Sequence, residues 1–315
     1  MNLARKFLFL ALVVTFAAGV CFAQYRPDGG RGRRGWFGGG NHGPMVRTEG
    51  GQMVNEETVR TARETMNQVE ETPSWTNSIG FEKDVFTFAR ILYTSPGRPA
   101  LMGWLNDYPD SDLNLSWRLH ELTSMTVDPD GRVLRITDPA LFDFPFVFAA
   151  QPGGMELTDA EIPILRRYLL NGGAFMLDDF WGTRDWLNVQ AEMKRVFPDR
   201  DWVELTVDHP LFHCVFDFKG PMNELQTPSI HHWLRANNPN GPDRKVSNYR
   251  GEGSEDMHVR ALLDDKGRIM VISMQNCDDG DGWEREAENE TFFKLFSERR
   301  AYPLGINILF YLMTH

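Results

Sequence analysis

The sequence predicts an α/β domain with a doubly wound, mostly parallel sheet to which an antiparallel hairpin is added. The first observation is a complete helix-to-strand crossover over residues 158–182. The second is the alternation of apolar strand segments with amphipathic helices along the chain, which is typical of parallel sheets. The third is a pair of extended segments, residues 259–263 and 268–274, joined by a short polar turn.

The crossover begins with a capping box and ends in two acidic residues. Thr158 caps a helix, and Glu161 reaches back to the free N–H of the cap. A pair of glycines stops the helix, and an apolar run follows that suits a strand covered on both faces. The run ends in Asp178 and Asp179. Because the carboxyl ends of parallel strands face the crevice that holds ligands, we expect a site here.

Composition divides the chain into four parts. Residues 1–23 have a basic start, an apolar core and a small-residue end, which is the layout of a secretory signal peptide. Residues 24–51 are rich in Gly and Arg and are expected to form a flexible linker. Residues 52–80 are expected to form a polar helix, over 55–71, and a connector; residues 81–315 suffice for one α/β domain. We therefore expect an exported protein, periplasmic or secreted, whose mature chain has no transmembrane segment.

The other elements follow in order. We expect a strand at 85–93, a helix from 110 or 111 to 122, a turn at 127–133, a strand at 145–150, a helix at 186–196, a strand at 203–207, a charged helix at 284–300 and an apolar helix at 304–313. Residues 219–256 are irregular, and a segment of this length inside a domain is usually functional or mobile. The last helix has about half the length of a bilayer span, so it is expected in the core.

Charge and cysteine content limit the partners. The chain carries 33 basic and 44 acidic residues, a net charge of −11, which argues against nucleic acid as a partner. Beyond the signal segment there are two cysteines, Cys214 and Cys277. An exported compartment permits a disulfide between them, but two buried free thiols are favoured because free cysteine packs as a small apolar residue.

Six segments of the chain resemble a family of exported bacterial proteins. They begin at Phe86 (FTFARILYTS), Asn106 (NDYPDSDLNLSWRL), Leu169 (LLNGGAFMLDDFWG), His209 (HPLFHCVFDF), Gly280 (GDGWE) and Ala301 (AYPLGINILFYLMTH). Together they are similar to the family called domain of unknown function 4159, over most of the chain. The resemblance implies a flavodoxin-like fold similar to the class I glutamine amidotransferase and trehalose-utilisation group. It implies no established activity.

The nucleophile of the amidotransferases is missing from this chain. Proteins of that group place a reactive cysteine on the turn after a central strand, where this chain has Asp178, Asp179 and Phe180. Cys214 lies in a different segment, so covalent catalysis of that kind is not expected. The sequence therefore indicates a pseudoenzyme with this fold.

Asp178 and Asp179 are nevertheless candidate catalytic residues. Consecutive side chains of a strand point to opposite faces, so one of the two is expected to face the crevice. There it would act as a general base or as a metal ligand. The alternative is structural, with one carboxylate as a helix cap and the other as an acceptor for backbone N–H groups.

His209 is a third catalytic candidate, and it resembles the His of a His-Pro motif in the amidotransferase-like group. His213 lies four residues further on, so on a helix the two imidazoles would share a face as metal ligands do. The chain has no H-E-x-x-H motif. A structural pair of histidines with backbone partners is favoured.

Two further groups carry acidic side chains. Asp278, Asp279 and Asp281 are weak candidates for a metal site, because Ca²⁺ prefers oxygen ligands on a flexible loop; an acidic turn before a helix from Glu284 is favoured, so no metal or cofactor is expected. The predicted binding residues are Asp107, Tyr108, Asp110, Asp179, Trp181 and His213. Aromatic side chains beside carboxylates suit sugars or peptides, and core packing with a helix cap is the alternative.

Three functions remain after this reasoning. The favoured one is a non-catalytic exported domain that binds a ligand or an envelope protein. The alternative is a hydrolase that uses Asp178 or Asp179 with His209 or His213 and a divalent cation. A structural role in an envelope complex is the third, and the sequence leaves open whether the protein is an enzyme.

Overall fold

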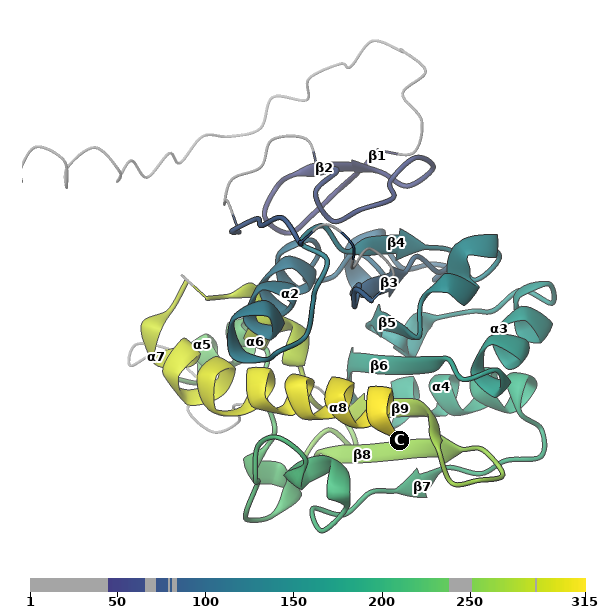
Figure 1. Ribbon diagram of the computed structural model, residues 1–315. Helices are drawn as coiled ribbons and strands as arrows, with labels where there is room; N and C mark the ends of the chain where they lie inside the picture. The colour runs from purple at the N-terminus through teal and green to yellow at the C-terminus, as the bar shows by residue number, and fades with distance from the viewer. Residues whose placement is uncertain (1–44, 66–71, 79, 81–83, 238–250, 287) are drawn as a thin grey trace, which may run out of the picture. The chain divides into compact units, whose positions relative to one another are not determined.

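Seven strands form the central sheet of the computed structural model, which describes residues 45–65, 72–78, 80, 84–237, 251–286 and 288–315. The strands are β3 (Ala89–Ile91), β4 (Arg132–Leu134), β5 (Phe146–Ala150), β6 (Ala174–Phe180), β7 (Val203–Glu204), β8 (His258–Leu263) and β9 (Ile269–Gln275). They lie in the order β4-β3-β5-β6-β9-β8-β7 (Figure 1). The first five strands in this order are parallel, and β8 is antiparallel to both of its neighbours. The predicted α/β class with an added antiparallel hairpin is confirmed.

Helices cover both faces of this sheet, as its apolar strands require. One face packs against α2 (Asp110–Leu122), α6 (Asp279–Glu284) and α8 (Tyr302–Thr314), and the other against α3 (Glu161–Leu170) and α4 (Gly182–Val196). Strand alternation divides the core accordingly. Met176 of β6 packs on the α2/α6/α8 face, whereas its neighbours Phe175 and Leu177 pack on the α3/α4 face.

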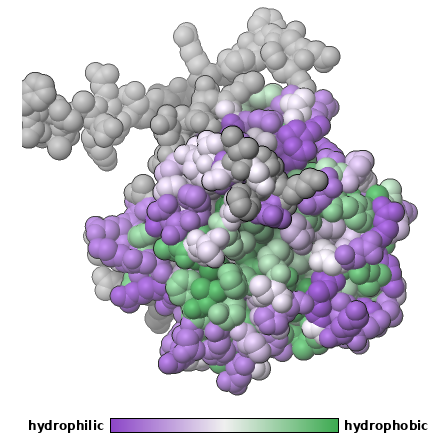
Figure 2. All heavy atoms as spheres, viewed as in Figure 1, coloured by the Kyte–Doolittle hydropathy of each residue, from purple (hydrophilic) through white to green (hydrophobic). Residues whose placement is uncertain are grey.

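The remaining elements surround the sheet. They are β1 (Met45–Arg47), β2 (Met53–Asn55), α5 (Ile230–Ala236), α7 (Glu290–Phe292) and the π-helix η6 (Phe293–Ala301). In the ranges that the structure describes, no helix combines the length and the apolar character that a membrane span requires. Figure 2 shows apolar residues gathered over α8 and hydrophilic residues around them.

The strand order places a switch point between β3 and β5. Counted along the chain, the five parallel strands have the order 2-1-3-4-5. The chain leaves β3 towards β4 and leaves β5 towards β6, which lie on opposite sides. Loops that follow these two strands therefore diverge and leave a crevice at the carboxyl edge, which is where ligands bind in open α/β sheets.

Several local predictions are confirmed. The capping box forms at α3, because the Thr158 N–H donates to Glu161 Oε2 (2.8 Å) and the Glu161 N–H donates to Thr158 Oγ1 (3.3 Å). The turn at 264–267 joins β8 to β9 as a hairpin. The final apolar segment is the core helix α8.

Other local predictions are wrong. Residues 53–55 form β2, and residues 56–65 form turns instead of a helix, because the Asn55 carboxamide accepts the Glu57 N–H and closes a turn. Residues 45–47, assigned to the linker, pair with β2. The acidic run itself forms α6, and the predicted helix at 284–300 is divided into α7 and η6. The signal segment, residues 24–44 of the linker and residues 66–71 lie outside the described ranges.

Arg90 of β3 fixes the loop that leads to α2. Its guanidinium, fully buried, donates to both carboxylate oxygens of Asp112 and to Ser111 Oγ. It also donates to the carbonyl oxygens of Trp104 (2.9 Å) and Asn106 (2.8 Å). The ion pair inside the core thus determines where the backbone of residues 104–112 runs.

Replacing Arg90 by methionine would leave Asp112 charged and unpaired inside the domain. We expect the free energy of unfolding in urea to fall by about 3–5 kcal/mol. Lys194→Met is the control, because it removes an exposed cation from its pair with Asp201 and should change stability by less than about 1 kcal/mol. Equal losses in the two variants would contradict the assigned role of Arg90.

Candidate functional site

Four residues at the carboxyl edge of the sheet have a left-handed backbone. Asp107, Gln151, Asp179 and Asn276 have φ values of 59°, 48°, 53° and 61°, and among the described residues no other non-glycine has a positive φ. Asp107 lies in the loop after β3, Asp179 lies near the end of β6, and Gln151 and Asn276 follow β5 and β9. Asn and Asp tolerate this conformation better than other residues. Backbone strain of this kind gathers at functional sites.

Asp179 is the centre of the hydrogen-bond network at this edge. Its Oδ2 accepts bonds from Asn106 Nδ2 and Gln151 Nε2, both at 2.8 Å. Its Oδ1 accepts a bond from Trp181 Nε1 at 2.8 Å. Side chains that follow three different strands therefore orient one carboxylate, which is 1% exposed.

Asp178 points to a different neighbour, as strand alternation requires. Its Oδ2 accepts the Gly280 N–H of α6 at 3.0 Å. Within the described part of the chain, its Oδ1 has no hydrogen-bond partner. A register shift between β6 and β9 follows Leu177 and ends at Phe180, and the left-handed Asp179 lies within it. The carboxylate of Asp178 therefore lies under α6, and that of Asp179 faces the crevice.

The acidic run after β9 organises the neighbouring elements. Asp278 Oδ1 caps α6 by accepting the Asp281 N–H at 3.0 Å. Asp281 Oδ2 accepts the Ile230 N–H at the start of α5 (2.7 Å). Asp279 Oδ1 accepts bonds from Thr227 Oγ1 (3.1 Å) and Cys277 Sγ (3.5 Å). The run joins α5 and α6 to the end of β9.

Asp107 lies opposite this run, against the backbone of α6. Asn106 Nδ2 donates to Asp107 Oδ1 at 2.8 Å, and Oδ2 has no partner in the part of the chain that is described. A Cβ on Gly280 would lie 2.1 Å from that Oδ2. Only glycine at position 280 therefore permits the observed approach of Asp107.

Two sets of carboxylates share Asp107. One oxygen from each of Asp107, Asp179 and Asp278 lies within 4.8 Å of the others, and the same holds for Asp107, Glu49 and Glu284. Apart from Glu49, all of these residues are buried. Like charges at this separation in a buried setting need protons or cations as compensation.

Arg285 provides part of that compensation. Its guanidinium lies 2.8 Å from Glu49, 3.0 Å from Glu284 and 3.5 Å from an oxygen of Asp281. It thus binds the outer carboxylates of the cluster. His231 contacts Glu49 as well, at 2.8 Å.

Burial raises the pKa values of Asp107, Asp178 and Asp279. The pKa of Asp107 is raised well above its usual value by burial and then by the charges of Asp281, Glu284 and Asp179. Burial and the charge of Asp279 raise the pKa of Asp178 in the same way. Burial raises the pKa of Asp279 to about 7, against hydrogen bonds that favour its charged form. Near neutral pH, carboxyl groups of the cluster retain protons unless a cation replaces them.

A cavity of about 590 Å³ opens above this cluster. Its walls come from the segments after β3, β5 and β9, from the end of β6, from the segment before β2 and from α5 and α6. They consist of Glu49, Leu101, Met102, Asn106, Gln151, Asp179, Ser229, His231, His232, Arg235, Asp278 and Asp281. The structure therefore places Asp179 in a cavity at the carboxyl edge, as the sequence predicted.

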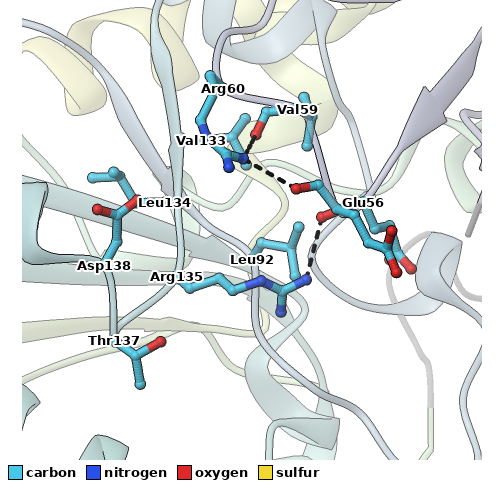
Figure 3. Close-up of a pocket in the computed structure, with 10 residues that line it drawn as sticks. Glu56, Val59, Arg60, Leu92, Val133, Leu134, Arg135, Thr137 and Asp138 are labelled. Carbon is cyan, nitrogen blue, oxygen red and sulfur yellow. Dashed lines mark hydrogen bonds between the residues drawn. The ribbon is translucent and has the colours of Figure 1, made fainter. Parts of the chain in front are cut away.

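Two other cavities contain none of these carboxylates. One of about 940 Å³ lies at the start of α4, with Trp181, Arg98 and Gly153 in its wall. A small one of about 140 Å³ lies beside β4 (Figure 3). There Arg60 and Arg135 donate to backbone carbonyls of residues 56, 57 and 59, which indicates a structural role for both arginines.

The remaining predicted site residues lie elsewhere. Tyr108 is a core residue whose hydroxyl donates to the Thr61 carbonyl. Asp110 lies in the first turn of α2 and does not line the cavity. Trp181 orients Asp179 but lines the neighbouring cavity. Tyr108 and Asp110 therefore lie outside the wall of the acidic cavity, of which Asp179 forms part.

The two predicted histidines occupy another region. His209 caps the short helix at Pro210–His213 and contacts the ring of Tyr311 in α8. His213 contacts Asp217 and the Val207 carbonyl. Neither histidine lines the acidic cavity. The favoured interpretation, a structural pair with backbone partners, agrees with these contacts.

Sequence reasoning missed much of the cavity wall. Gln151 follows an apolar strand directly, so the rule that identified Asp179 would have found it. Asn106 stands beside Asp107 in the predicted loop. His231, His232 and Arg235 lie in the segment that was expected to be irregular, where α5 forms instead. That adjacent pair of histidines was the available signal.

Both described cysteines are free thiols, so the favoured prediction is confirmed on this point. Cys277 is buried and Cys214 is exposed, so burial was predicted correctly for one of them. Burial and the neighbouring charges of Asp279 and Asp178 raise the pKa of the Cys277 thiol well above its usual value. A thiol in that setting is a poor nucleophile.

Fold and site together define a class: an α/β domain with a mostly parallel sheet and an acidic cavity at its carboxyl edge. Residues 87–313 match the family described as domain of unknown function (DUF4159). The chain belongs to that family, and the resemblance seen in the sequence is confirmed. No curated protein matches the chain.

The raised pKa of Asp279 predicts a pH dependence of stability. The folded state retains a proton up to about pH 7, whereas an unfolded aspartate loses it near pH 4, so stability falls as pH rises from about 4 to about 7. In the variant Asp279→Asn, the side chain at position 279 cannot ionise. In chelator at about pH 8 we expect this variant to exceed the wild type by on the order of 1–3 kcal/mol in urea unfolding, with little gain at about pH 4.

Asp143→Asn is the control for this experiment. Asp143 is exposed and precedes β5, at the opposite edge of the sheet. Its substitution should leave the pH profile of stability unchanged. An identical fall with pH in Asp279→Asn and in the wild type would refute the assignment.

Proposed function

We propose that this domain is a flavodoxin-like, non-catalytic binding domain that holds a small polar ligand in the acidic cavity. The order 2-1-3-4-5 of its parallel strands supports that fold. The observation that carries the function is the convergence of Asn106, Gln151, Asp179 and Asp278 on one cavity of about 590 Å³. Cavities of this size with a few convergent polar groups are typical ligand sites.

The chemistry of the wall supports a class of ligand. Four carboxylates face the cavity, whereas the basic side chains in its wall are Arg235 and two histidines. Carboxylates accept hydrogen bonds and repel anions. A ligand that offers hydroxyl or amine donors, such as a sugar or a polyamine, therefore suits the cavity better than an anion.

The end of β6 supports binding over amidotransferase-like catalysis. Asp178 and Asp179 occupy the position where a nucleophilic thiol is expected in proteins of that kind, and the buried Cys277 has a raised pKa. The layout of residues 1–23 supports export to the periplasm or the medium, where an envelope protein is a further candidate partner.

The binding function is tested by calorimetry and thermal shift with two sets of probes. Glucose, maltose, glucosamine and putrescine represent donors, and succinate and inorganic phosphate represent anions. We expect a donor probe to bind and the anions not to bind. Met102→Trp, at a half-exposed wall position, should weaken this binding at least tenfold by filling the cavity.

Leu187→Trp is the matched control, because Leu187 is similarly exposed (56%, against 52% for Met102) but lies on α4 outside the acidic cavity. It should leave the affinity unchanged. Absence of binding by every donor probe, or equal effects of the two tryptophans, would overturn the proposal.

A hydrolase is the second candidate. The observation that favours it is that His231 and His232 share the cavity with Asp179, so an imidazole and a carboxylate are available for acid–base catalysis. These histidines replace His209 and His213 of the sequence-based hypothesis. Turnover of nitrophenyl esters or glycosides that is lost in Asp179→Asn and kept in Asp143→Asn would establish this function and exclude the non-catalytic one.

A further inference from the structure

We propose that the carboxylates of Asp107, Asp179 and Asp278 bind one divalent cation, with Ca²⁺ as the best fit, at the base of the acidic cavity. This inference rests on the proposed function, because the cation would form part of the same ligand site. The three residues come from the loop after β3, from β6 and from the end of β9.

The three carboxylates lie close enough together to share one ion. One oxygen from each of the three residues lies within 4.8 Å of the other two. Ca²⁺ accepts six to eight oxygen ligands in flexible geometry, whereas Mg²⁺ demands a near-ideal octahedron and keeps several of its waters. Three carboxylates that come from different parts of the chain therefore suit Ca²⁺ better than Mg²⁺. Carboxylate oxygens are the ligands that such hard cations prefer.

The unpartnered Oδ2 of Asp107 is an independent observation that indicates a cation. Asp107 is 1% exposed, and its Oδ2 has no hydrogen-bond donor among the residues that the structure describes. A buried carboxylate oxygen without a donor is unfavourable unless a proton or a cation binds it. Asp107 belongs to both carboxylate sets, so this group lies where the two sets meet.

The guanidinium groups around Asp107 are engaged with other carboxylates. Arg90 binds Asp112, and Arg285 binds Glu49 and Glu284. They lower the electrostatic cost of the cluster but do not provide a hydrogen bond to Asp107 Oδ2. The central position of the cluster thus suits an added positive charge.

The surrounding donors hold the ligand groups in place. Asn106 and Gln151 both donate to Asp179 Oδ2, and Trp181 donates to Oδ1. Asp278 is fixed in turn by its cap bond to α6. Outer bonds of this kind orient the ligands of metal sites and favour the charged form.

The test uses the full chain, freed of metal by chelator and then titrated with Ca²⁺ and, separately, with Mg²⁺ in a calorimeter. We expect one Ca²⁺ per chain and at least tenfold weaker binding of Mg²⁺. Asp107→Asn should weaken Ca²⁺ binding at least tenfold. Asparagine tolerates the left-handed backbone of Asp107, and its Oδ1 keeps the bond from Asn106.

Asp143→Asn provides the control for the loss of one negative charge, and Ca²⁺ affinity should not change in it. Asp278→Asn is the second variant, because an asparagine still caps α6; it should also weaken Ca²⁺ binding at least tenfold. No heat of Ca²⁺ binding, or affinities in both site variants equal to that of Asp143→Asn, would overturn the inference. Tighter binding of Mg²⁺ would overturn the choice of Ca²⁺.

The melting temperature gives a second readout that a purely structural aspartate would not produce. In chelator, Asp107→Asn should melt above the wild type because it removes a buried like charge. In saturating Ca²⁺ the order should reverse, because only the wild type gains the free energy of binding. An unchanged order in the two buffers would count against the cation.

The same titrations separate this inference from the proposed function. If a donor probe binds equally in chelator and in Ca²⁺ while no Ca²⁺ heat is seen, the cation site is refuted and the ligand site stands. If Ca²⁺ binds through Asp107 but no donor probe binds in either buffer, the metal site stands and the proposed ligand function fails.

Discussion

A single buried guanidinium, that of Arg90, holds the loop that brings Asn106 and Asp107 to the carboxyl edge. Hydrogen bonds to the carbonyls of Trp104 and Asn106 fix the loop, and the pair with Asp112 fixes the start of α2. A charge in the core is tolerated only with complete pairing and hydrogen bonding. The fold therefore ties the stability of its interior to the geometry of its acidic cavity.

The cavity itself is a product of strand order and local backbone conformation. The switch between β3 and β5 separates the loops at one edge of the sheet. The left-handed residues Gln151, after β5, and Asp179, near the end of β6, then turn an amide and a carboxylate towards that opening. A regular strand end would have alternated these side chains between the two layers of helices.

The sequence was informative where a pattern has one physical solution. Thr158 with Glu161, the glycines at 172 and 173, and the apolar run to Leu177 predicted the crossover, and the doublet that follows predicted the edge where the cavity lies. The sequence did not show that Tyr108 and Asp110 lie outside the cavity wall, because a loop gives no periodicity from which to infer orientation. Arg90 decides that orientation through contacts across 22 residues, and single-residue patterns do not encode such contacts. The acidic run at 278–283 was expected to be a turn, and its glycines do disfavour a helix. It forms the helix α6 because Asp278 caps it and because it is buried against β6.

The bonds made by the acidic run have a mechanical consequence. Asp278, the cap residue of α6, and Asp281, within α6, both line the cavity, and Asp281 accepts the first N–H of α5. Helix α5 carries His231, His232 and Arg235, which line the same cavity. The bond between Asp281 and Ile230 therefore couples the position of α6 to that of α5, so a displacement of one helix would also shift the cavity residues carried by the other.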